Sequence, residues 1–151
     1  MTGKSHMKIA LGIALWTVNP DVIVGAVIGS LLPDIDTKNS KLGKYNLFIR
    51  LKCVKKHVKH RGVTHSLIGL MSFMFISSVL FDIVSTTGLF IGIVSHLVAD
   101  MATVGGIQLL WPKRSKIRFA CLKTDGWLEW IISTSILLTG ILLLVRCAVN
   151  V

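Results

Sequence analysis

Apolar residues along this chain gather into four long stretches that are separated by polar segments. The stretches cover residues 9–32, 67–84, 87 to about 110, and 127–149. A helix that crosses a membrane needs about 20 apolar residues, so the second and fourth stretches are expected to span. The third also qualifies if its ionisable residues face protein rather than lipid. No stretch alternates as a strand does, and the predicted fold class is all-α.

The first stretch is interrupted by Asn19-Pro20-Asp21, which is typical of the end of one helix and the start of another. Asn19 is expected to cap the second helix, Pro20 to take its first position, and Asp21 to face the positive end of the helix dipole. The two halves, 8–18 and 20–32, are each too short to span alone. We therefore predict a broken helical hairpin with both ends on one side; a single kinked span is the alternative.

Composition indicates a membrane protein. Hydrophobic residues make up 52% of the 151 positions and charged residues only 16%, with a mean hydropathy of +0.71, whereas an ordinary soluble domain is about 25% charged. We expect residues 1–151 to form a single membrane-embedded helical domain, with about three full transmembrane helices plus the hairpin. The polar start MTGKSHMK is interpreted as retained rather than cleaved. The three cysteines lack CxxC spacing, which argues against a thiolate metal site or a disulfide scaffold.

The charge distribution predicts how the chain is oriented. Lys and Arg number 17 against 7 Asp and Glu, a formal net charge of +10. Many of these cations lie in 37–61 and 113–123, so the positive-inside rule places both segments in the cytoplasm and the short turn at 84–87 outside. Trp111 and Trp127 flank the second basic segment, where an aromatic belt is expected.

Three polar motifs border or interrupt the apolar stretches, where ionisable groups are costly. They are Leu-Pro-Asp-Ile-Asp at 32–36, His-Arg-Gly-Val-Thr-His-Ser at 60–66, and Ser-His-Leu-Val-Ala-Asp at 95–100. His96 and Asp100 are four residues apart and so share one helix face. Each motif also has a purely structural interpretation, as a capping turn, a solvated loop or a buried pair. His57, in a Lys-rich run, and Asp82, at a helix end, keep that interpretation.

Together with an early histidine, these motifs offer imidazole and carboxylate groups, which suit zinc or another borderline divalent metal. The candidate metal ligands are His6, Asp34, Asp36, His60, His65, His96 and Asp100. Seven ligands could serve more than one ion, and a two-metal site activates water for phosphoester hydrolysis. We expect Arg61, Asp36 and Thr64 to take part in catalysis, because guanidinium binds phosphate oxygens, a carboxylate can bridge ions and a hydroxyl can donate a hydrogen bond. Ser66 could donate a further bond.

One metal centre requires all of its ligands on the same side of the membrane. A break of the third helix at Gly105-Gly106 would place Asp100 about a turn and a half from the cytoplasmic end, at 3.6 residues per turn. The hairpin would return His6 to Asp34, whereas an uninterrupted helix would strand it on the opposite face. We therefore predict the His6 imidazole within about 6 Å of an Asp34 carboxylate oxygen, close enough to share or bridge ions.

The order of these motifs, from the early histidine to the Trp-Pro pair at 111–112, resembles the YdjM-like family. Its members are described as inner-membrane, metal-dependent hydrolases. The resemblance covers roughly residues 5–112, and His-Arg-Gly-x-Thr-His-Ser is its most specific motif. The family is distantly similar to zinc-dependent phospholipase C and P1 nuclease, which implies zinc and phosphoester hydrolysis. Residues 127–149 carry no motif and are expected to be a C-terminal transmembrane anchor.

Three functions of different classes remain open on the sequence. The leading hypothesis is a multi-pass metal-dependent hydrolase of the bacterial inner membrane, with its site on the cytoplasmic side. Its expected partners are membrane lipids and a lipid or lipid-linked phosphoester substrate, because basic loops attract anionic headgroups. The alternative is a non-catalytic protein that transports or senses divalent metal. A membrane-tethered nucleic-acid binder is disfavoured, since aromatic residues are sparse in the basic segments.

Overall fold

A computed structural model describes residues 1–36 and 62–150 of the chain. The helices are α1 (Gly3–Ala14), α2 (Pro20–Gly29), α5 (Leu67–Leu80), α6 (Ile83–Met101) and α7 (Trp127–Val149). Three short 3-10 turns accompany them: η1 (Leu15–Thr17), η2 (Pro33–Asp36) and η4 (Val63–His65). The predicted all-α class is confirmed over these residues, whose only β pairing consists of isolated bridges.

The helical break in the first apolar stretch is confirmed. The Asn19 side chain accepts hydrogen bonds from the backbone N–H groups of Asp21, at 2.9 Å, and Val22, at 3.3 Å, and Pro20 opens α2. Val18, with φ 53°, turns the chain between the two helices. The structure thus contains the hairpin and not the single kinked span. Its first helix starts earlier than expected, at Gly3, so that His6 lies inside α1.

The boundary between the next two helices differs from the prediction. The stretch 67–84 was expected to span as one unit, but α5 ends at Leu80 and has only 14 residues. Asp82 caps α6, and the predicted external turn at 84–87 lies within the first turns of that helix. Two helices, α6 and α7, are long and apolar enough to cross a membrane. The expectation of about three full spans is therefore not confirmed.

The end of α6 also differs from the prediction. The helix stops at Met101 rather than at Gly105-Gly106. The segment beyond is held by isolated bridges that pair Thr103 with Leu122 and Ile107 with Ile117. Asp100 consequently lies in the last turn of α6, beside the loops at that end.

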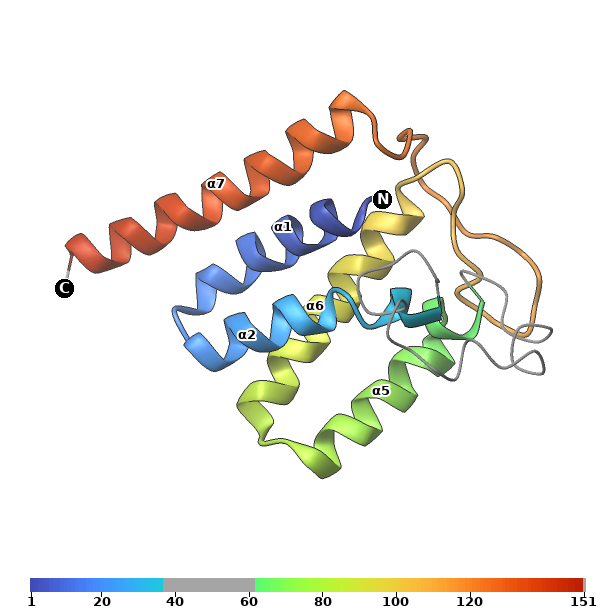
Figure 1. Ribbon diagram of the computed structural model, residues 1–151, viewed down its shortest axis with the longest axis horizontal. Coiled ribbons are helices and arrows are strands. Elements are labelled where there is room, and N and C mark those ends of the chain that lie inside the picture. The colour runs from blue at the N-terminus through green and yellow to red at the C-terminus, as the bar shows by residue number, and fades with distance from the viewer. Residues whose placement is uncertain (37–61, 151) are drawn as a thin grey trace.

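Helix α6 is the centre of the fold. It packs against α2, α1 and α5, while α7 lies along the outer side of α1 (Figure 1). Contact with α2 is close because glycines face each other there: a Cβ added at Gly92 would lie 2.2 Å from the Ala26 carbonyl oxygen. The N-terminus, the end of α2, the start of α5 and the end of α6 meet at one end of the bundle (Figure 1). This end, called the loop end below, also carries the 102–126 segment.

Candidate metal centre

Three imidazoles and two carboxylates converge at the loop end. Segments far apart in the sequence supply them: α1 contributes His6, η2 contributes Asp34, η4 contributes His65, and α6 contributes both His96 and Asp100. All except Asp34 are almost fully buried. Because buried ionisable groups are costly unless they are paired or bound to a metal, this cluster calls for a chemical explanation.

His96 is fixed in one tautomer by the backbone of α2. Its Nδ1 lies 2.6 Å from the carbonyl oxygen of Ser30. A carbonyl can only accept, so Nδ1 carries the proton and donates it. The Nε2 atom of the neutral ring is then left with a lone pair that points into the cluster. A backbone carbonyl that holds the outer nitrogen of an imidazole in this way is typical of histidine metal ligands.

The two inner nitrogens of His65 and His96 face each other. Their Nε2 atoms are 3.2 Å apart, and the Nδ1 of His65 lies 3.1 Å from the Thr64 hydroxyl. Two imidazole nitrogens bound about 2.0–2.1 Å from a tetrahedral ion lie about 3.3–3.4 Å apart. The observed separation therefore fits two ligands of one ion.

His6 provides the clearest sign of an additional bonding partner. Its ring stacks on His96, with centroids 3.6 Å apart and planes inclined by 10°. Neither of its ring nitrogens has a hydrogen-bond partner among the described residues, although the side chain is buried. The contact from Nε2 to Asp100 Oδ1, at 3.4 Å, is too long for a good hydrogen bond. A metal ion would give this orphaned nitrogen a partner.

The two carboxylates lie on either side of the imidazoles. Asp34 Oδ1 is 3.6 Å from the Nε2 of His65 and 3.9 Å from that of His96, and Asp100 Oδ2 lies at the same two distances. Asp100 also contacts the α-amino group of Met1. Burial alone would raise the pKa of Asp34, but the contact with His65 and the charges of the nearby imidazoles hold this pKa below its ordinary 3.8. Asp34 is therefore available as an anionic ligand at neutral pH.

The ligand atoms form two groups that share one residue. His6, His96 and Asp100 make one group, and Asp34, His65 and His96 the other, with all ligand atoms of a group within 4.8 Å of one another. Nitrogen and oxygen ligands without thiolate suit zinc and related divalent ions. The residues present thus fit a metal centre, and five of the seven predicted ligands are among them; that they bind a metal remains a prediction.

The remaining predicted residues lie partly outside and partly within the described part of the chain. His60 and Arg61 lie outside the described residues, as does the side chain of Asp36. The Thr64 hydroxyl bonds the His65 ring, and Ser66 caps α5 by accepting from Gly69 N–H. His6 and Asp34 approach His96 in the two groups that share it, as the hairpin predicts. The predicted limit of about 6 Å between them remains a prediction.

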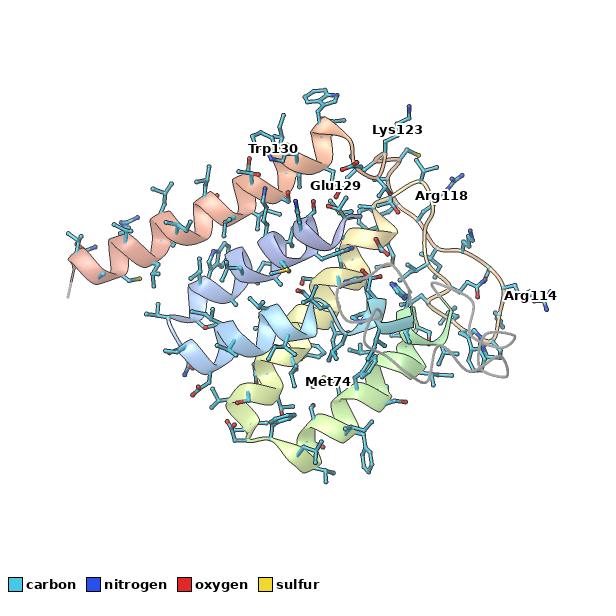
Figure 2. The ribbon with its side chains drawn as sticks, viewed as in Figure 1. Met74, Arg114, Arg118, Lys123, Glu129 and Trp130 are labelled. Atoms are coloured by element: carbon cyan, nitrogen blue, oxygen red, sulfur yellow. The ribbon has the colours of Figure 1, made fainter. Side chains whose placement is uncertain are left out.

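The sequence did not point to Glu129, which lies in the segment expected to be a plain anchor. Its carboxylate is buried and accepts hydrogen bonds from the backbone and hydroxyl of Thr2, at 2.7 and 2.9 Å, and from the Asp125 backbone, at 2.9 Å. It thereby ties the start of α7 to the start of α1 (Figure 2). The available signal was a carboxylate within an otherwise apolar helix.

Among the described residues, several basic side chains lie at the loop end outside the cluster. Arg114, Arg118 and Lys123 are exposed and project from the segment between α6 and α7 (Figure 2). The guanidinium group of Arg118 donates to the Val104 carbonyl at 3.3 Å, which holds that group near the end of α6. The cations give this end of the bundle a positive field.

The fold and this centre define an all-helical membrane protein with a buried His/Asp cluster of the kind that binds divalent metals. The chain belongs to the family described as "YdjM inner membrane protein", whose model matches residues 1–150. It is 35% identical to "Uncharacterized protein YvsG" of Bacillus subtilis, over 93% of this chain and 92% of that protein. It is 31% identical to "Inner membrane protein YdjM" of Escherichia coli, over 87% of this chain and 83% of that protein. No solved structure matches the chain.

Family membership confirms the first part of the resemblance, an inner-membrane protein of bacteria. The similarity to phospholipase C and P1 nuclease and the hydrolase activity remain predictions.

Proposed function

We propose that this chain is a membrane-bound metal-dependent hydrolase that cleaves a phosphoester in a lipid or lipid-linked substrate. The convergence of two imidazoles and two carboxylates on His96, at one end of the bundle, carries the proposal. It is supported by the Ser30 carbonyl that orients His96 and by the unpartnered nitrogens of His6. The proposed chemistry resembles that of zinc-dependent phospholipase C and P1 nuclease.

The proposed metal is zinc, as one ion or two. A bound divalent ion would lower the pKa of a water molecule and stabilise the negative charge that develops on the phosphate. Asp34 is the most exposed of the five ligands, so it marks the side from which substrate approaches. Arg61, Asp36 and Thr64 are proposed, on the sequence motifs, to bind phosphate oxygens, bridge ions and donate a hydrogen bond.

The proposed location of the site is the cytoplasmic side of the inner membrane. The loop end carries the basic segment 113–123, which the positive-inside rule places in the cytoplasm. Near an anionic surface each Lys or Arg attracts lipid headgroups by ~1 kcal/mol. The same cations would draw an anionic phosphoester toward the cluster.

The test compares the wild-type protein with His96→Ala and His57→Ala, all purified in detergent. We expect zinc to copurify with the wild type, as measured by plasma mass spectrometry. We also expect hydrolysis of bis-p-nitrophenyl phosphate that a chelator abolishes and zinc restores. His96→Ala should lose both properties, whereas His57, which is not a predicted ligand, should be dispensable. Absence of zinc from the wild type after handling in chelator-free buffer would refute the proposal.

Divalent-metal transport or sensing is the second candidate, because His96 and Asp100 lie in a helix long enough to span. A metal-loaded wild type that hydrolyses neither soluble nor lipid phosphoesters, yet moves zinc into proteoliposomes, would favour transport. We prefer hydrolysis because the described ligands gather at one end of α6 rather than along it.

A further inference from the structure

An apolar groove of about 500 Å³ lies between α2, α5 and α6. Its walls are mostly aliphatic and aromatic, and include Val24, Ile28, Leu32, Phe73, Ile76 and Ile93. A volume of this size is in the range of small-molecule sites, which are lined mainly by apolar side chains.

One end of this groove is lined by residues that lie close in sequence to the candidate metal ligands. Leu32 is two residues before Asp34, and Ile93 precedes His96 by about one helical turn. The other end is formed by Asp21 at the start of α2 and by Ser85 near the start of α6. From Ser85 to Ile93 the groove extends about 12 Å along α6, at 1.5 Å per residue. It therefore runs lengthwise along α6, from Ile93, about one turn before His96, toward the opposite end of the bundle.

The exposure of the ligands distinguishes this groove from a second one. The second, of about 440 Å³, lies between α1, α6 and α7 and ends at Met1 and Ala102. Those residues lie beside Asp100, whose side chain is only 2% exposed. The side chain of Asp34, two residues after Leu32 of the first groove, is 17% exposed. A phosphoester bound at Asp34 could therefore extend into the first groove, whereas the second meets a sealed side of the cluster.

We infer that the groove between α2, α5 and α6 holds the apolar chain of a phosphoester lipid whose phosphate lies at the proposed metal centre, on the side of Asp34. The inference rests on the proposed function and adds to it the place where the long hydrocarbon chain of the substrate is bound. The groove supplies an apolar wall over its length, its Leu32 and Ile93 are the lining residues nearest in sequence to Asp34 and His96, and the exposed cations of the loop end suit an anionic headgroup. Selectivity for long-chain substrates follows from this arrangement.

The test uses phosphatidic acid with a diazirine in one acyl chain, mixed with the full-length protein in dodecyl maltoside. After photolysis, labelled peptides are identified by mass spectrometry. We expect labels on α2 and α5, and competition by unlabelled long-chain phosphatidic acid but not by glycerol phosphate. Val24→Trp, which fills the groove, should weaken binding about tenfold, the loss expected when two methylenes leave an apolar site. Val98→Trp, in the second groove, is the matched control.

Each variant is checked by its zinc content and melting temperature, and Ile76→Trp blocks the same groove from α5 if Val24→Trp does not fold. Hydrolysis of bis-p-nitrophenyl phosphate, which has no long chain, should be unchanged in Val24→Trp. Labelling that concentrates on α1 and α7, or that Val24→Trp and Ile76→Trp leave unchanged, would overturn the inference. Loss of hydrolysis in every assay, with labelling intact, would instead count against the proposed function.

Discussion

The close contact between α2 and α6 predicts that one added methyl group will weaken metal binding. At Gly92, a Cβ would lie 2.2 Å from the Ala26 carbonyl oxygen and 2.7 Å from the Ser30 nitrogen. These are backbone atoms, which cannot rotate away. To restore an ordinary contact of 3.4 Å, α2 would have to move by about 1 Å. Gly92→Ala should therefore separate the two helices.

That displacement acts directly on the ligands. The Ser30 carbonyl is the hydrogen-bond partner of His96, and Asp34 follows four residues later. Metal sites tolerate ligand displacements of only about 0.2 Å, and loss of an outer hydrogen bond to a ligand typically lowers metal affinity about 10–100-fold. We expect the zinc dissociation constant of Gly92→Ala to rise by about this factor. Overpacking of this kind also costs about 1–3 kcal/mol of folding free energy.

Zinc affinity in detergent is measured by competition with a chromogenic chelator, and stability by thermal unfolding. Two further Gly→Ala variants separate local strain from an effect on the site. At Gly3 a Cβ meets nothing within 4 Å, so Gly3→Ala should match the wild type. At Gly140 the Cβ would lie 2.3 Å from the Gly12 carbonyl oxygen, between α7 and α1. Gly140→Ala should lower the melting temperature yet bind zinc nearly normally. Wild-type zinc affinity in Gly92→Ala would show that α2 does not position the ligands.

Three other expectations concern the ligands, the start of α7 and the topology. His96→Ala should remove zinc from both ligand groups, because they share this residue; unchanged zinc content with a lower melting temperature would indicate a structural pair instead. Glu129→Gln should lower the stability in detergent by about 1–3 kcal/mol, because it leaves buried donors imperfectly matched; an unchanged melting temperature would contradict this. A cysteine at Asp82 should react with an impermeant maleimide from outside the cell and native Cys121 only from the cytoplasm, and the reverse pattern would invert the topology.

Some features of the fold could be predicted because their causes are local. The break at Asn19-Pro20 depends on a cap, a fixed φ angle and a dipole, all of which lie within four residues. The start of α6 had a comparable signal, because the side chain of Asp82 accepts from the backbone and hydroxyl of Ser85. The predicted helix boundary was nevertheless wrong, because Phe81 and Ile83 on either side of Asp82 are apolar. The hydropathy pattern therefore runs across the cap without a break.

Other features depend on partners that are distant in the sequence. Helix α6 ends at Met101, whose carbonyl accepts from Phe119, and the next carbonyl accepts from Leu122. No pattern around the glycines at 105–106 encodes these partners. Glu129 is satisfied by Thr2, which lies 127 residues away. The gathering of His6, Asp34, His65, His96 and Asp100 was easier to predict, since a buried histidine or aspartate in an apolar segment requires a partner wherever that partner lies.

The hairpin explains how a helix too short to span a membrane contributes to the centre. Helix α2 has 10 residues and is about 15 Å long, half of a hydrocarbon core of about 30 Å. As one straight helix with α1 it would carry His6 and Asp34 to opposite ends. Folded back at Val18, the two helices instead bring both residues to His96. The same fold lays the glycine face of α2 on Gly92 of α6. The break thus places the ligands at one end, and the close contact holds them in register with the imidazole of His96.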